Sequence, residues 1–297
     1  MKRVTSTRGD QLASDGLCVP RDQRHELEII AIVLWHDILA SRFDGGLTSY
    51  ALHRKIESSS DFDPKKFPRF ARGLRRPRPT LTSHADQYVK GSGRIITHLL
   101  WRTLAADFHA RTEAQTVLAG LTPVIRNLVQ SDTPSGLLRV SVPLPVNEQV
   151  LRQLQRHIDL DSLACLTFLL RDASEKEKHA LAFVIGDALF RVLVVFLSWL
   201  PAQRIRQRLF DVFARRIFPL ACDRGMTYQV ADYSLADAVF LLNNDFLVAE
   251  DAETIEPTWS ARIERHMSAF DRYPDRLLPM IGRRPSKTNQ VSDRHAP

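Results

Sequence analysis

The run from His179 to Leu200, HALAFVIGDALFRVLVVFLSWL, is almost entirely apolar and must be covered on nearly every side. It is long enough to span a bilayer as a helix. However, Asp187 and Arg191 lie near its centre, and each would cost roughly 2.5–3.5 kcal/mol in the middle of a membrane. A spacing of four residues lets the two charges pair along one helix face. We therefore expect a helix buried in a protein core, with Asp187 and Arg191 as a buried ion pair, and no membrane insertion.

The rest of the apolar pattern is also helical. Residues 24–42 are nearly continuous in apolar side chains, which predicts a helix covered on most sides at the centre of the N-terminal half. In the N-terminal half, further helices are expected from Thr48 or Ser49 to Ile56, from Thr82 or Ser83 to Val89, over the helical spacing of 95–108, and over 116–129 with a kink or break at Pro123. In the C-terminal half, they are expected over 150–158, from a cap at Asp161 to Leu169, and over 205–217, where one face is basic and solvated. The fold class is thus mainly α.

The region after Gly225 allows two interpretations. Ser234 and Asp237 suit the start of a helix, whereas AVFLLNNDFLVA also suits two short strands around Asn244 and Asp245, that is, one short β-hairpin. A segment with three prolines, 131–147, separates two helical halves and predicts an extended linker. We therefore expect a flexible N-terminus at 1–23, a helical domain at 24–130, the linker at 131–147, a helical domain at 148–280 and a disordered tail at 281–297.

Three widely separated cysteines, Cys18, Cys165 and Cys222, argue against a disulfide framework and against paired-cysteine metal sites. The N-terminus is basic but has no apolar run directly behind it, so a secretory signal is not expected. Together these features predict a cytoplasmic protein.

The charge of the chain is concentrated in one stretch, the basic segment Lys65–Thr80, KKFPRFARGLRRPRPT. It contains no acid and carries +7, which equals the formal net charge of the whole protein; its cations are Lys65, Lys66, Arg69, Arg72, Arg75, Arg76 and Arg78. Such a dense block of like charge needs a polyanion, an acidic surface or solvation. A helix that presents the first four of these cations, followed by a loop with the other three, is suited to neutralising phosphates along a duplex.

The order of residues around this segment resembles the lambda-repressor or Xre-type helix-turn-helix. Leu47-Thr48, Leu52 and Ile56 match the second helix of that family, and Phe67, Phe70, Gly73, Arg75 and Pro77 match the third helix and its exit turn. The resemblance covers 47–88 and implies a DNA-binding unit in which Lys65, Lys66 and Arg69 face the groove, where lysine and arginine can read guanine. His53, Ala71, about four extra residues near 58–61 and Pro68 inside the third helix depart from the family pattern.

An acidic block opposes the basic one. Residues 225–257 contain no lysine or arginine and carry −7. One hypothesis is that this segment folds over the basic segment, within a molecule or between subunits, and competes with nucleic acid. The simpler alternative is that both blocks are ordinary solvated surface.

Motifs for catalysis or metal binding are not evident. The sequence has no HExxH, no G-x-S-x-G and no Walker A motif. Asp61 with Asp63, and Asp159 with Asp161, are carboxylate pairs that can hold a divalent ion, but both suit helix caps better. Gly91-Ser92-Gly93 before a helix can cradle a phosphate, although a plain loop is the simpler interpretation.

These features predict a DNA-binding protein, as a transcriptional regulator or a nucleic-acid-sensing component, with duplex DNA as partner, a possible homodimer and no cofactor or metal. We expect it not to be an enzyme. The alternative is a helical adaptor whose basic segment docks an acidic protein or its own residues 225–257; an enzyme that uses Asp187, Arg191 or a carboxylate pair is the third reading of the sequence.

Overall fold

The computed structural model describes residues 21–43, 48–56, 65–135, 138–230, 233–250 and 259–283, with short stretches in which only the backbone is described. The α-helices are α1 Arg21–Ser41, α2 Ser49–Ile56, α3 Lys66–Ala71, α4 Pro79–Tyr88, α5 Leu99–Thr103, α6 Ala110–Gly120, α7 Pro123–Val129, α8 Glu148–Gln155, α9 Leu160–Glu175, α10 His179–Ser198, α11 Arg206–Arg216, α12 Leu235–Glu250, α13 Trp259–Arg272 and α14 Pro274–Leu277. The 3-10 turns are η1 Ser92–Arg94, η2 Leu200–Ala202 and η3 Phe218–Leu220, and the strands are β1 Gln130–Ser135, β2 Leu138–Pro143, β3 Cys222–Asp223, β4 Met226–Gln229 and β5 Met280–Arg283. The predicted mainly α class is confirmed.

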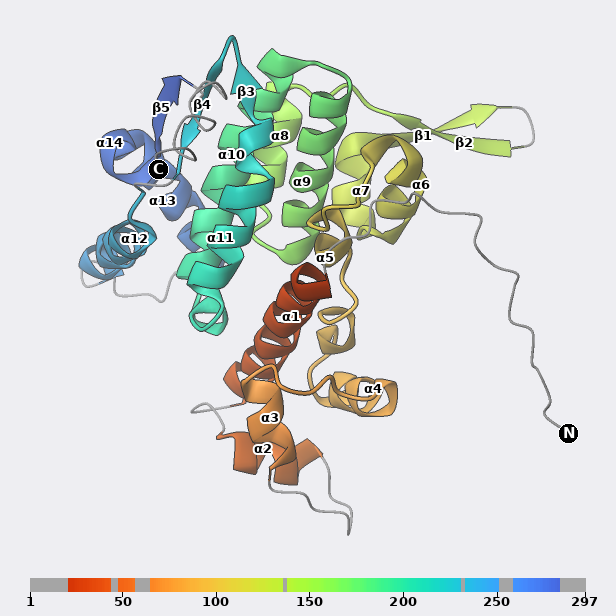
Figure 1. The fold of residues 1–297 in the computed structure, drawn as a ribbon, viewed down its shortest axis with the longest axis vertical. Coiled ribbons are helices and arrows are strands. Elements are labelled where there is room, and N and C mark those ends of the chain that lie inside the picture. Colours follow the sequence, from red (N-terminus) through yellow and green to blue (C-terminus); the bar gives the residue numbers. More distant parts are fainter. Residues whose placement is uncertain are drawn as a thin grey trace, which may run out of the picture.

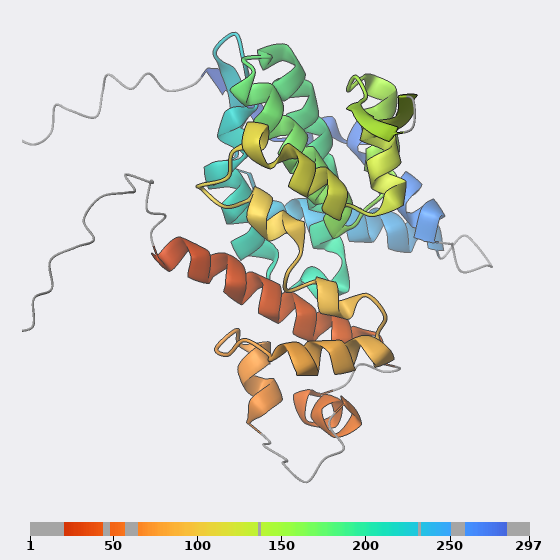
Figure 2. The same cartoon turned by 90° about the vertical axis from the view of Figure 1, so that its right-hand side faces the viewer.

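The helices form two parts of unequal size (Figure 1). A small N-terminal lobe, defined here as α2, α3 and α4, lies at one end of the long axis, and a larger helical body of α5 to α14 lies at the other. Figure 2 shows α1 crossing the molecule between these two parts. This position explains the nearly continuous apolar sequence of α1, because the helix is covered by the lobe on one side and by the body on the other.

Aromatic packing joins α1 to the lobe. Trp35 of α1 is fully buried, and its ring lies 5.7 Å from that of Phe70 and 6.5 Å from that of Phe67, both on α3. Leu52 and Ile56 of α2 are also fully buried in the same cluster. Offset and edge-on ring pairs of this kind add to the stabilisation from burial.

The apolar helix α10 is the central element of the body. It packs against α8, α9, α12 and α13, and the side chains along it from Leu189 to Leu197, Arg191 excepted, are buried. By length and composition it is the one helix in the described ranges that is able to cross a membrane, yet 67% of its most apolar window is buried inside the fold. Neighbouring helices therefore supply the cover that its sequence requires.

Several predicted helix boundaries are wrong. The helix expected from Thr82 or Ser83 begins at Pro79, because proline at the first helical position needs no backbone donor. The helical spacing over 95–108 forms only the five residues of α5. Pro123 splits its region as predicted, but the first piece, α6, begins at Ala110.

One helix cap differs from the prediction, and a second cap was not predicted. Asp159, and not Asp161, caps α9: its carboxylate accepts from Ser162 N at 2.7 Å, and Ser162 Oγ lies 3.3 Å from Asp159 N, which completes a capping box. The first turn of α6 is capped from a distance, since Ala110 N and Arg111 N donate to the Glu175 carboxylate at 2.8 and 3.1 Å.

The predicted linker forms an antiparallel hairpin, β1 with β2, that projects from the body in Figure 1. The extended character expected of the segment is therefore present. Helices α5 and α6, which precede the hairpin, pack against α9, which follows it. The division into separable domains stays a prediction.

A three-stranded antiparallel sheet, in the order β3-β4-β5, was not predicted. Arg224 and Gly225, with φ of 48° and 78°, form the tight turn between β3 and β4. Ile281 to Arg283, expected to begin the disordered tail, instead pair with β4. Residues 234–250 adopt the helical alternative, with Ser234 Oγ accepting from Asp237 N at 3.3 Å, so the strand interpretation of this region is wrong.

Candidate nucleic-acid interface

Helix α3 separates apolar and cationic side chains onto opposite faces. Phe67, Phe70 and Ala71 are buried against α1 and α2. Lys66, Arg69 and Arg72, spaced by three residues, fall on the other side, and Arg69 and Arg72 are exposed. The aromatic core thus fixes which way the cations of α3 face.

A Schellman motif ends α3 and sets the path of the exit loop. Gly73 has a φ of +69°, its N–H donates to Phe70 O at 2.9 Å, and Leu74 N donates to Arg69 O at 2.9 Å. Glycine is required here, because a Cβ on Gly73 would also lie 2.7 Å from Ile29 Cγ2. After this turn Arg75, Arg76 and Arg78 are all exposed.

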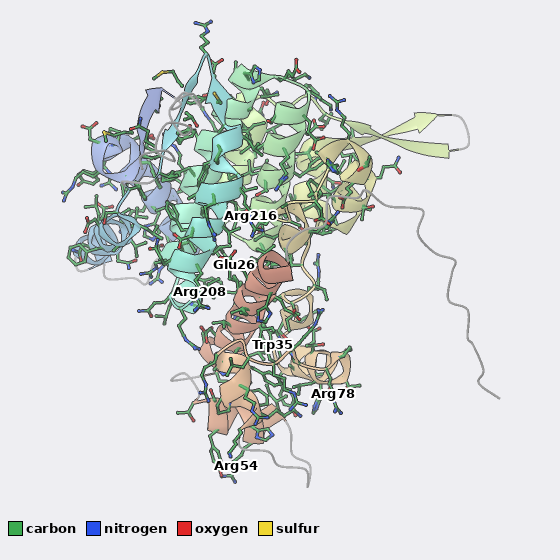
Figure 3. The ribbon with its side chains drawn as sticks, in the orientation of Figure 1. Glu26, Trp35, Arg54, Arg78, Arg208 and Arg216 are labelled. Atoms are coloured by element: carbon green, nitrogen blue, oxygen red, sulfur yellow. The ribbon has the colours of Figure 1, made fainter. Side chains whose placement is uncertain are left out.

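Helix α2 adds two cations that the sequence interpretation did not include. Arg54 and Lys55 are exposed on α2, and the Lys55 ammonium lies 4.4 Å from the Phe43 ring centre. Together with the seven cations of the basic segment they make nine, and residues 48–56 and 65–80 contain no acid. We call these nine residues the basic surface. Figure 3 places Arg54 at the outer end of the lobe and Arg78 at its side.

The acids of α1 do not neutralise this surface as a whole. Glu28 pairs with Arg76 at 3.3 Å, in an exposed contact that contributes little energy. Glu26 is engaged by arginines of α11, at 2.7 Å from Arg215 and 3.2 Å from Arg216. Figure 3 shows Glu26 and Arg216 close together where α1 meets the body.

The basic face expected on α11 is thus partly used to hold α1. Besides the two contacts to Glu26, Arg204, just before α11, lies 2.8 Å from Asp37 Oδ1 and also donates to the Ala71 carbonyl at the end of α3. These bonds link the helical body to α1 and to the lobe. Arg204 and Arg215 are exposed, as predicted for this face, and in addition they form ion pairs with α1.

Three large apolar or aromatic side chains are exposed on the lobe. Leu74 is 68% exposed between the cations of the exit loop, and Tyr50 and Tyr88 are about half exposed. Basic side chains interleaved with such groups suit contact with nucleic acid, where apolar and aromatic groups meet bases. They suit a protein partner equally well.

The departures from the helix-turn-helix pattern have local explanations. Pro68 is the third residue of α3, within the first turn, where the backbone nitrogen has no intrahelical acceptor to lose. His53 is fully buried, with its ring stacked 5.2 Å from that of Phe67. The extra residues near 58–61 lie outside the described residues, and the family resemblance itself stays a prediction.

The described part of the acidic segment does not fold over the basic segment. Helix α12 packs against α10, α13 and α14 in the body, and both ribbon views place it far along the long axis from α3 and α4. Its Asp245 pairs with Arg272 at 2.7 Å. Residues 251–257 lie outside the described residues, so for that part of the segment, within a molecule or between subunits, the hypothesis stays a prediction.

Asp187 and Arg191 form the predicted pair, half-buried at the wall of a groove of about 630 Å³ between α8, α10 and α13. Arg191 donates to Asp187 Oδ2 and to Asp271 Oδ1, each at 2.9 Å, and its guanidinium lies 5.4 Å from the Phe270 ring. Burial alone lowers the pKa of Arg191, but the two carboxylates outweigh burial and raise it overall. Because these charges satisfy one another, the pair fits a structural tie between α10 and α13 better than a reactive site.

The remaining candidate sites predicted from the sequence have different outcomes. Asp159 is a helix cap and Asp161 is not, while Asp61 and Asp63 lie outside the described residues. The amides of Ser92, Gly93 and Arg94 are already donated to Val89 O, Asp86 Oδ1 and Gly91 O, so they form a closed turn and not a phosphate cradle. Cys165 and Cys222 are free, and burial raises the pKa of Cys165. In the described residues no group of three potential metal ligands occurs.

Comparison of the chain with protein-family models, curated proteins and solved structures gives no match.

Proposed function

We propose that the protein binds duplex DNA through the basic surface of its N-terminal lobe, as a transcriptional regulator or a nucleic-acid-sensing component. The observation that carries this proposal is that α3 has one apolar and one basic face: Phe67 and Phe70 are buried, so Lys66, Arg69 and Arg72 are directed outward. Phosphate contacts from such cations supply affinity and position the protein on the duplex. Lys65, Lys66 and Arg69 are the groups proposed to reach base edges.

The test is binding of a fluorescent duplex, measured by anisotropy, to wild type and to a variant with Arg69, Arg72, Arg75 and Arg76 changed to alanine. The matched control replaces four exposed cations of the body, Arg152, Arg156, Lys176 and Lys178, by alanine. Both variants have a formal net charge of 7 − 4 = +3. We expect the lobe variant to bind at least about tenfold more weakly than the control. Equal affinities of the two variants, or no binding by wild type near physiological salt, would refute the proposal.

A second candidate function is docking of an acidic protein on the same surface. It is favoured by Leu74, because an apolar side chain 68% exposed within a basic loop is suited to an apolar contact ringed by charge pairs. The two functions are separated by changing Leu74 to serine. Loss of a co-purifying acidic partner, with duplex binding unchanged, supports docking.

A further inference from the structure

A second site lies where α1 and η1 meet the helical body. A cavity of about 370 Å³ opens between the end of α1, the η1 turn, the first turn of α9 and the last turn of α10. This volume is within the range of small-molecule sites. None of the nine cations of the basic surface lines it, so the cavity is separate from the proposed DNA interface.

The cavity wall contains two buried polar groups whose bonding is incomplete. Ser92 is 1% exposed, and its hydroxyl has no hydrogen-bond partner among the described residues. Asp161 is 7% exposed, and its Oδ1 has no well-aligned donor in the same part of the chain. Buried polar atoms without partners are rare in folded proteins and call for a ligand or a water molecule.

Three groups near Asp161, namely His98, Arg94 and the Thr122 hydroxyl, engage its carboxylate, but none gives Oδ1 a well-aligned hydrogen bond. His98 Nδ1 accepts from Leu100 N at 3.1 Å, so a neutral His98 carries its proton on Nε2, which lies 3.3 Å from Asp161 Oδ1. The Arg94 guanidinium is 3.8 Å away. Burial raises the pKa of Asp161, but His98, Arg94 and the Thr122 hydroxyl together outweigh burial, so the pKa lies below its ordinary value and the group is an anionic acceptor.

The rest of the cavity has a different character. Phe196, Trp199 and Ile158 supply apolar and aromatic wall. Arg42 and Lys90 are exposed at its lining, and neither side chain makes an ion pair or hydrogen bond within the described ranges. The site therefore combines a buried carboxylate, a flat apolar wall and two available cations.

We propose that this cavity binds a guanine mononucleotide. Guanine presents two neighbouring N–H donors on one edge, which a carboxylate such as Asp161 accepts together, and the Ser92 hydroxyl is positioned on the same wall to bond the base. The aromatic wall covers the base, and Arg42 and Lys90 pair with the phosphate. Adenine offers an acceptor beside its donor on that edge, which would face the carboxylate unfavourably.

The test is isothermal titration calorimetry of the full chain with GMP, AMP and guanosine. Wild type is expected to bind GMP at least about tenfold more tightly than AMP, because a carboxylate hydrogen bond is lost with the wrong base. Asp161→Asn is expected to abolish this preference. Joint replacement of Arg42 and Lys90 by alanine is expected to reduce GMP affinity to that of guanosine without changing guanosine binding.

Arg152→Ala with Arg156→Ala, two cations of the body outside the cavity lining, is the charge-matched control and should bind GMP as wild type does. No GMP binding up to about 1 mM, equal binding of GMP and AMP, or unchanged GMP affinity in a folded Asp161→Asn protein would overturn the proposal. If Asp161→Asn does not fold, Ser92→Ala replaces it, with weaker GMP binding expected and unchanged binding contradicting the site. None of these measurements depends on DNA binding, so the nucleotide proposal and the proposed function are tested independently.

Discussion

The salt dependence of the proposed DNA binding follows quantitatively from the basic surface. If Lys65, Lys66 and Arg69 reach base edges, six of its nine cations are left to contact phosphates: Arg54, Lys55, Arg72, Arg75, Arg76 and Arg78. Each contributes about 0.9 to the slope of log K against log salt, which gives a slope of roughly −5.4, or roughly −4.5 if Arg76 keeps its pairing with Glu28. Between about 50 and 200 mM salt, affinity should then fall by roughly 500-fold to 2,000-fold.

Removing four cations of the basic surface tests the same arithmetic. The variant with Arg69, Arg72, Arg75 and Arg76 changed to alanine retains three contacts, for which the slope is about −2.7 and the loss over the same salt range is roughly 40-fold. Anisotropy titrations at four or more salt concentrations measure both slopes. Equal slopes for wild type and variant, or a wild-type slope near zero, would show that these side chains do not bind phosphates.

Three further predictions concern the fold that presents this surface. Phe70→Ala should lower the free energy of unfolding in urea by about 3–5 kcal/mol, whereas Phe240→Ala, at a position 68% exposed, should change it by less than about 0.5 kcal/mol. Gly73→Ala should lower it by roughly 1–3 kcal/mol, since φ is +69° and the new Cβ meets Ile29, and calorimetry measures the lower Tm. Burial lowers the pKa of His266 to about 4; neutral His266 therefore contributes stability above about pH 6.5 that is lost as pH falls towards 4, roughly 3 kcal/mol in all, and His266→Gln should flatten that part of the stability profile.

Each of these has a clear contrary result. Equal effects of the two phenylalanine changes would mean that α3 does not pack on α1. An unchanged Tm for Gly73→Ala would mean that the Schellman turn is not formed. A pH profile that is the same with and without His266 would mean that this ring is not buried in its neutral form.

The separation of apolar and basic side chains on α3 can be predicted from the sequence, because it depends only on the spacing of residues within that helix. Phe67 and Phe70 are three residues apart and the cations fall between and beyond them, so one helix must separate them. The exposed pair Arg54 and Lys55 has a signal in the sequence, a basic run at the end of a predicted helix.

Other features depend on distant packing and have no local signature. His98 and Asp161 meet only because α5 packs against α9, and nothing near either residue indicates the other. Likewise β5 pairs with β4 across the intervening α12 to α14, so nothing in the residues next to Ile281 to Arg283, which lead into a polar stretch, indicates the pairing. The spacing over 95–108 suits one long helix, but α5 ends at Thr103 and turns follow over 104–107, beyond which the Phe108 ring is buried.

The most direct test of the central claim is site-specific photocrosslinking to a labelled duplex. A photoreactive phenylalanine analogue replaces either Leu74, in the exit loop of α3, or Phe240, on α12; both side chains are 68% exposed, so their solvent access is matched. The proposed interface predicts a DNA adduct from position 74 and none from position 240. Equal adducts at the two positions, or an adduct from position 240 alone, would contradict the placement of DNA on the N-terminal lobe.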